Sequence, residues 1–239
     1  MDIVGALAAH EGTTCFVGAG GKKTTMAALA ARLDRAVVTA TVRIPIFDDW
    51  VARVAVTDDP VAAVAATDEW PVGVVPERER EDRYLGYDRE TVAALADCGV
   101  PVLVKADGAR MRRFKAPSDR EPQIPSTADT VVPIASAHVV GQPLTDERVH
   151  RVDRVADLTG LEPGDTIRAA DVATVLASDR GGRKGVPDGA TVIPLVNMVD
   201  DDELAATARE IARAIHDRAD VPRVVLAEMR APDPLVDVV

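Results

Sequence analysis

Residues 13–25 read TTCFVGAGGKKTT, and this stretch decides the fold that we expect for the chain. Thr13–Val17 predicts a β-strand, because β-branched and aromatic residues dominate it. A glycine cluster ends the strand, and Thr24–Leu33 predicts an Ala-rich helix directly after it. A strand, a glycine turn and a helix in this order begin a βαβ unit, so the sequence favours a parallel sheet.

The glycine turn has the composition of a phosphate-binding loop. Glycines let backbone N–H groups point at an anion, and the start of a helix adds partial positive charge. A Lys at the end of such a turn neutralises phosphate charge, and a following Thr hydroxyl is a ligand for Mg²⁺. We therefore predict that ATP or GTP binds with Mg²⁺ at Gly18, Ala19, Gly20, Gly21, Lys22, Lys23, Thr24 and Thr25.

The match to the pattern G-x-x-x-x-G-K-[ST] is imperfect. One register uses Lys22 as the phosphate lysine but leaves Lys23 where Ser or Thr belongs. The other register uses Lys23 followed by Thr24, and then Lys22 stands in a glycine position. Either lysine is thus a candidate catalytic residue, with Thr24 as the metal ligand. The alternative is a glycine-rich turn that binds nothing.

The rest of the chain alternates short β-rich runs with helical segments. This pattern predicts an α/β fold, a P-loop NTPase-like mostly parallel sheet flanked by helices. We expect one domain over 1–239 with a small helical subregion at 145–187. Further strands are expected at 36–41, 53–57, 72–76, 100–105, 130–134, 191–196 and 223–227, and further helices at 60–66, 89–97, 146–158, 169–177 and 200–214.

The composition excludes several classes of protein. The chain has 239 residues, of which 47% are hydrophobic and 28% charged, which is the balance of a folded protein. Its net charge of −11 disfavours nucleic acid as a partner. No apolar run approaches the roughly 20 residues that span a bilayer, and residues 1–10 lack a basic export signal, so we expect a cytoplasmic protein with no membrane partner. Cys15 and Cys98 are too few for a disulfide framework, and His138 and His150 are expected to make ordinary hydrogen bonds.

An acidic residue follows the most apolar predicted strand. Asp107 stands two residues after the run that ends at Lys105. Because the carboxyl ends of parallel strands lie at one edge of a sheet, we expect Asp107 to face the glycine turn. There it would hold Mg²⁺ or orient an attacking water. The alternative is that Asp107 and Gly108 only form a turn.

The segment Asn197-Met198-Val199-Asp200 also follows a predicted strand. It is similar to the N-K-x-D pattern by which many GTPases read guanine, although Met198 replaces the Lys. We therefore predict Asn197 and Asp200 as base-reading residues. The alternative is that Asp200 is the N-cap of the helix that follows.

A group of basic residues comes shortly after Asp107 in this acidic chain: Arg110, Arg112, Arg113 and Lys115. We take Arg110 and Lys115 as candidates for binding an anion, such as a γ-phosphate, a phosphorylated pterin cofactor or an oxyanion. The alternative is a solvated surface run balanced by Asp119 and Glu121.

Several segments together resemble a known family. They are Phe16–Lys22, Thr39–Ile44, Ala106–Arg110, Phe114–Pro117, Glu121–Pro125, Gly141–Leu144, Val149–Arg151, Lys184–Pro187 and Asn197–Asp200. In this order they resemble the selenium-dependent hydroxylase accessory proteins of the YqeC type, also called selenium cofactor biosynthesis proteins. The likeness runs over about 13–200, and the block Ala106–Pro125 is its most specific part.

The resemblance implies a nucleotide-binding accessory factor for maturing molybdenum hydroxylases that carry selenium. Its partners would be a client hydroxylase or the proteins that handle the client's cofactor, and slow NTP hydrolysis would gate delivery. The alternatives are a scaffold that binds nucleotide without turnover, and a kinase or ligase that activates an oxyanion or small acid. Two departures from the family, Lys105 in place of Glu and Arg43 in place of a Thr-Lys pattern, are expected to weaken a second metal and strengthen anion binding.

Overall fold

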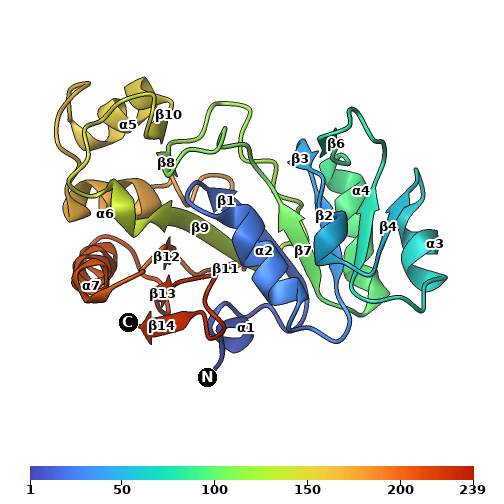
Figure 1. The fold of residues 1–239 in the computed structure, drawn as a ribbon. Helices are drawn as coiled ribbons and strands as arrows, with labels where there is room; N and C mark the ends of the chain where they lie inside the picture. The colour runs from blue at the N-terminus through green and yellow to red at the C-terminus, as the bar shows by residue number, and fades with distance from the viewer.

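A ten-stranded, mostly parallel sheet runs through the computed structural model, which describes residues 1–239 (Figure 1). The order across the sheet is β14 (Leu235–Val238), β13 (Val225–Ala227), β12 (Leu195–Asn197), β9 (Thr130–Ser136), β1 (Thr13–Gly18), β7 (Val102–Lys105), β2 (Val37–Ala40), β5 (Val72–Val75) and β4 (Arg53–Val56), with β11 (Thr191–Val192) also paired to β9. Only the β13–β14 pair is antiparallel within this sheet. β1 therefore lies in the middle of the sheet, between β9 and β7. The ends of both neighbouring strands can then lie beside the glycine turn that follows β1.

Helices cover both faces of the sheet. α1 (Ile3–Ala6) and α2 (Lys22–Ala30) pack on one face, where Phe16 of β1 and Leu103 of β7 join their core. On the other face, α3 (Pro60–Ala65), α4 (Arg89–Ala93) and the 3₁₀-helix η2 (Ala94–Cys98) cover the half of the sheet beyond β1, and Cys15 and Val104 point to them. Successive strand residues thus serve opposite cores, as the strand period of two dictates.

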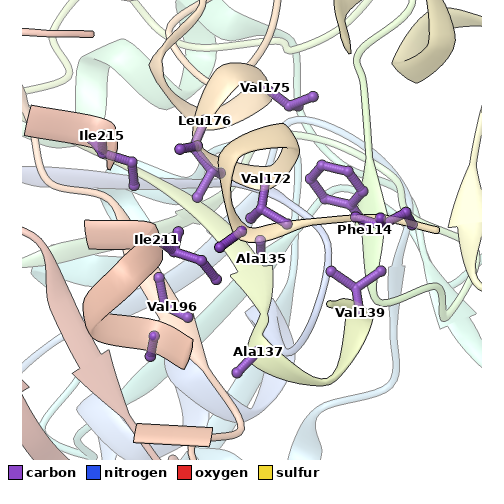
Figure 2. Packing of buried hydrophobic residues seen from close by; sticks show 14 of the residues in the cluster. Phe114, Ala135, Ala137, Val139, Val172, Val175, Leu176, Val196, Ile211 and Ile215 are labelled. Atoms are coloured by element: carbon purple, nitrogen blue, oxygen red, sulfur yellow. The ribbon is translucent and has the colours of Figure 1, made fainter. Parts of the chain in front are cut away.

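The remaining helices bury the other half of that face. α5 (Val152–Thr159), α6 (Ala169–Ala177) and α7 (Asp202–His216) share the largest hydrophobic cluster with Ala135 of β9 and Val196 of β12. Figure 2 shows Val172 and Leu176 of α6 and Ile211 of α7 gathered around Ala135 of β9. α5 and α6 fall within 145–187, the stretch predicted as a helical subregion.

Short elements complete the chain. They are β3 (Ile44–Pro45) paired with β6 (Arg83–Tyr84), β8 (Phe114–Lys115) paired with β10 (Val149–His150), and the 3₁₀-helices η1 (Asp48–Trp50) and η3 (Ala137–Val139). No helix combines the length and the apolar character that crossing a bilayer requires.

The prediction of an α/β fold with a mostly parallel sheet flanked by helices is confirmed, and the arrangement is consistent with a P-loop NTPase-like fold. Three predicted elements were wrong in detail. The helix predicted at 146–158 begins only at Val152, because Arg151 has a left-handed φ of 67°. The strand predicted at 191–196 is interrupted at Pro194, which has no N–H for the ladder. The strand at 223–227 is not the last, because Leu235–Val238 returns to pair with it.

Candidate functional site

The glycine turn and Asp107 lie together at the carboxyl ends of two neighbouring strands. β1 and β7 run parallel with Phe16 opposite Lys105, so both chains leave the sheet at the same edge. The Gly18 N–H donates to Asp107 Oδ2 at 2.8 Å. Lys22 Nζ donates to the Gly18 carbonyl and lies 2.8 Å from Asp107 Oδ1. The proximity of turn and carboxylate expected from the sequence is therefore present.

The two candidate lysines occupy different environments. The Lys22 side chain is only 5% exposed and reaches Asp107, which accepts from the Gly18 N–H. Lys23 is half-buried and forms no ion pair. Thr24 is half-buried, and the buried Thr25 donates its hydroxyl to the Gly21 carbonyl at 3.1 Å. Of the two registers left open by the sequence, the geometry favours the one in which Lys22 faces the turn.

The glycines of the turn have close protein neighbours. A Cβ on Gly20 would lie 2.5 Å from the Ser136 nitrogen and 2.9 Å from the Arg113 carbonyl oxygen. A Cβ on Gly21 would collide with Asn197 Nδ2, and both glycines have positive φ values, 99° and 124°. Packing on β9 and β12 therefore requires these glycines whether or not a ligand approaches them.

The same turn leaves a run of backbone donors free. The N–H groups of residues 20–24 donate to no acceptor in the protein, whereas the neighbouring Ala19 N–H is bonded to Ile134. Successive N–H groups at a glycine-rich bend followed by a helix form a concave donor set for an anion. One side of the turn thus packs against β9, while the N–H groups of residues 20–24 have no hydrogen-bond acceptor in the protein.

A third strand end brings Lys115 to Asp107. Phe114 packs into the α6 cluster seen in Figure 2, so the next residue of β8 points the opposite way, toward the site. Lys115 Nζ lies 2.9 Å from Asp107 Oδ2 and 2.9 Å from Glu121 Oε2, and it donates to the Gly108 carbonyl at 2.6 Å. Arg151 Nη1 lies 2.8 Å from the same Glu121 oxygen. The solvated-surface interpretation of the basic run is therefore wrong for Lys115.

Burial and charge act against each other at Asp107. Burial alone acts to raise its pKa, but the Lys22 and Lys115 ammonium groups hold the pKa below the usual value. The carboxylate is therefore charged at neutral pH and binds two buried cations. Burial likewise acts to raise the pKa of Glu121, but Lys115 and Arg151 together hold that pKa below the usual value.

Lys105 is a buried amine without a carboxylate partner. Its Nζ donates to the Arg43 carbonyl at 2.7 Å. Burial, together with repulsion from Lys22, lowers the pKa of Lys105 to about 7. Because the folded pKa lies below the unfolded value of 10.5, protonation opposes folding, and this penalty is complete below pH 7 and disappears as the pH rises toward 10.5.

We predict that Lys105→Met stabilises the protein by about 1–3 kcal/mol at pH 7, because a buried charge is replaced by an apolar chain. The gain should shrink at pH 9.5, where the wild-type amine is neutral. Urea unfolding at both pH values measures this, with the half-buried Lys23→Met as the control. A Lys105→Met protein less stable than wild type at pH 7 would contradict the assignment.

The donor set around Asp107 does not suit a magnesium ion. Nowhere do three His, Cys, Asp or Glu side chains gather as metal ligands do. Asp107 Oδ2 accepts from the Gly18 N–H and lies 2.9 Å from Lys115 Nζ, whereas Oδ1 lies 2.8 Å from Lys22 Nζ and accepts no hydrogen bond. Mg²⁺ prefers an octahedron of oxygen ligands, and two fixed ammonium groups at this carboxylate would repel it. The metal site predicted for Thr24 and Asp107 stays a prediction, and the two ammonium groups beside Asp107 count against it.

The predicted base-reading residues are engaged by the protein. Asn197 Nδ2 donates to the Gly20 carbonyl at 2.8 Å, and Asn197 Oδ1 accepts from the Met229 N–H at 3.3 Å. Asp200 Oδ2 lies 2.6 Å from His138 Nε2. The N-cap of α7 is Asp201, not Asp200 as one interpretation of the sequence had it. Asn197 therefore joins the end of β12 to the glycine turn by a hydrogen bond.

The other two candidates for binding an anion, Arg43 and Arg110, form no ion pair with Asp107 or Glu121. The Arg43 side chain is exposed and forms an ion pair with Glu79 at 2.6 Å, and only its carbonyl meets Lys105. Arg110 is exposed and has a left-handed φ of 47°. Sequence reasoning missed the positions of Glu121 and Arg151, although both stand in segments that carried the family resemblance.

Two cavities lie away from the turn. One of about 220 Å³ is lined by residues that include Pro117, Arg154 and Lys184. The other, about 290 Å³, is lined by residues that include Arg89 and Ile124. Neither includes a residue of the glycine turn.

Comparison with known proteins agrees with the resemblance. A sequence model of the YqeC protein family matches residues 14–153, which contain the turn, Asp107, Lys115, Glu121 and Arg151. The chain is 29% identical over 156 residues to the YqeC protein of Escherichia coli (strain K12), an alignment that covers 64% of this chain. The chain spans about 60% of the length of that relative. No solved structure gives a significant match. Because the family model covers more than half of the chain, this protein belongs to the YqeC family.

Proposed function

We propose that this chain is a nucleotide-binding accessory factor for the maturation of selenium-dependent molybdenum hydroxylases. In this proposal the phosphate groups of ATP or GTP bind at the glycine turn. The observation that carries it is the run of unbonded N–H groups at residues 20–24 beside the buried Lys22. Backbone donors, a helix N-terminus and one ammonium group are what a phosphate requires.

The proposed biological role comes from the family resemblance. The nucleotide state would control docking to a client hydroxylase or to a protein that handles the client's cofactor. Asp107 forms ion pairs with Lys22 and Lys115, and its Oδ2 accepts from the Gly18 N–H, which favours binding over hydrolysis. Slow hydrolysis, and activation of an oxyanion or small acid, stay predictions. Phosphate release measured with and without client separates turnover from binding alone.

Calorimetric titration of ATP and of GTP tests the site. We expect Lys22→Met to weaken binding by about 2–3 kcal/mol, roughly 30- to 150-fold, because one charge-assisted contact to phosphate is lost. Lys23→Met, the adjacent control, should bind as wild type does, because Lys23 is half-buried and unpaired at the edge of the turn. Unfolding curves of both variants check that the fold is kept. Equal affinity of wild type and Lys22→Met would contradict the proposal.

A further inference from the structure

We propose that the glycine turn binds phosphate groups without a divalent cation, with Lys115 holding the place beside Asp107 that a metal would need. This inference rests on the proposed nucleotide binding and specifies its charge chemistry. Three features support it: the fixed position of Lys115, the excess of basic over acidic side chains around Asp107, and the free N–H donors of the turn.

Lys115 is fixed rather than mobile. Its side chain is 0% exposed, it donates to the Gly108 carbonyl and to Glu121 Oε2, and it forms an ion pair with Asp107. Phe114, buried in the neighbouring core, and the pairing of β8 with β10 hold its backbone in place. An ammonium that is buried, hydrogen-bonded and paired with two carboxylates in this way keeps its place beside Asp107 against a cation.

The buried cluster carries more positive than negative charge. Four cationic side chains (Lys22, Lys105, Lys115 and Arg151) surround two carboxylates, Asp107 and Glu121. The basic groups outnumber the acidic groups by two, and burial lowers the pKa of both Lys22 and Lys105. Unbalanced charge away from water is costly, so an added anion relieves the cluster and an added divalent cation worsens it.

The donors of the turn complete the site for an anion. Five consecutive N–H groups, from residue 20 to residue 24, are unbonded next to the cationic cluster. They orient phosphate oxygens, while the field of the lysines supplies the neutralisation that Mg²⁺ supplies in metal-dependent sites. The ligand class is therefore a polyphosphate in its metal-free form, and the terminal phosphates, not the base, provide recognition.

The test is calorimetric titration of the full chain with ATP, GTP and inorganic tripolyphosphate, in EDTA and in excess MgCl₂. We expect the dissociation constant in EDTA to lie within about threefold of that in magnesium, or below it. Affinity at least tenfold weaker in EDTA would overturn the inference and leave nucleotide binding intact. Absence of binding in both buffers would overturn the proposed function and the inference together.

A variant tests the part assigned to Lys115. Lys115→Met should weaken tripolyphosphate binding in EDTA at least tenfold, and magnesium should restore part of the loss because Asp107 is then less shielded. The control is Lys184→Met, since Lys184 is half-buried and donates to the Ser118 carbonyl away from Asp107. Unchanged affinity of a folded Lys115→Met protein in EDTA contradicts the inference. If that variant does not fold, the wild-type comparison between EDTA and magnesium decides alone.

Discussion

Asp107→Asn is expected to destabilise the protein by about 3–5 kcal/mol at pH 7, because it removes the anion from a buried set of ion pairs. The Asn side chain keeps the shape of Asp and can still accept from the Gly18 N–H. It cannot neutralise Lys22, whose ammonium has no other carboxylate within ion-pair distance. Breaking one side of a buried pair leaves the other charge without compensation, and that penalty dominates the effect.

Urea unfolding at pH 7 and at pH 3 measures the effect. The pKa of Asp107 is held low in the folded state, so its stabilisation is present above about pH 3.9 and is lost as the pH falls through the folded value. The difference in the free energy of unfolding between wild type and Asp107→Asn should therefore be smaller at pH 3 than at pH 7. Asp119→Asn is the control, because Asp119 pairs with Arg154 on the surface and its loss should change stability little. If Asp107→Asn lowered the free energy of unfolding as little as Asp119→Asn, the Asp107 carboxylate would not be what stabilises the cluster.

Gly20→Ala is the second change with a large expected effect, a loss of about 3–5 kcal/mol. One part is the strain of a non-glycine residue at a φ of 99°. The other part is overpacking, since the added methyl group would lie 2.5 Å from the Ser136 nitrogen. Relief of this contact requires the turn to move off β9, so the free N–H groups would lose their common direction and phosphate affinity should fall as well.

Gly164→Ala separates the two parts. Gly164 has the same φ of 99° but nothing lies within 4 Å of a Cβ built on it. We expect it to cost only the backbone strain, about 1–2 kcal/mol. Thermal or urea unfolding of the two variants gives the packing contribution as a difference. If Gly20→Ala and Gly164→Ala lost the same stability, the turn would not be packed on β9 as described.

Much of the fold could be predicted because its signals are local. Thr13–Val17, the turn and the helix after it are readable from β-branched residues, glycines and helical periodicity. Asp202–His216 was readable from its apolar face. The signals that failed were short or nonlocal: Leu235–Val238 forms a strand only because β13 offers an edge to pair with. The left-handed backbone of Arg151, which moves the start of α5 to Val152, cannot be predicted from the residue types around it.

The site divides in the same manner. Proximity of Asp107 to the turn follows from a parallel sheet, in which neighbouring strands end at one edge. The choice between Lys22 and Lys23 does not follow, because adjacent residues at a helix start differ in direction by about 100°, and only the packed helix shows which one points inward. The hydrogen bond from the Asn197 side chain to the Gly20 carbonyl joins residues 177 apart in sequence, and no local pattern predicts it.

The sequence by itself determined the class of fold, the place of the turn after the first strand, and the kinds of side chain available to it, because these depend on propensity, period and residue type. Tertiary structure alone decided that Lys115 and Glu121 join Asp107, that Lys105 is buried without a carboxylate, and that the donors of residues 20–24 are free. These last features depend on burial and on contacts across strands. Both arise only when distant segments pack against one another and exclude water.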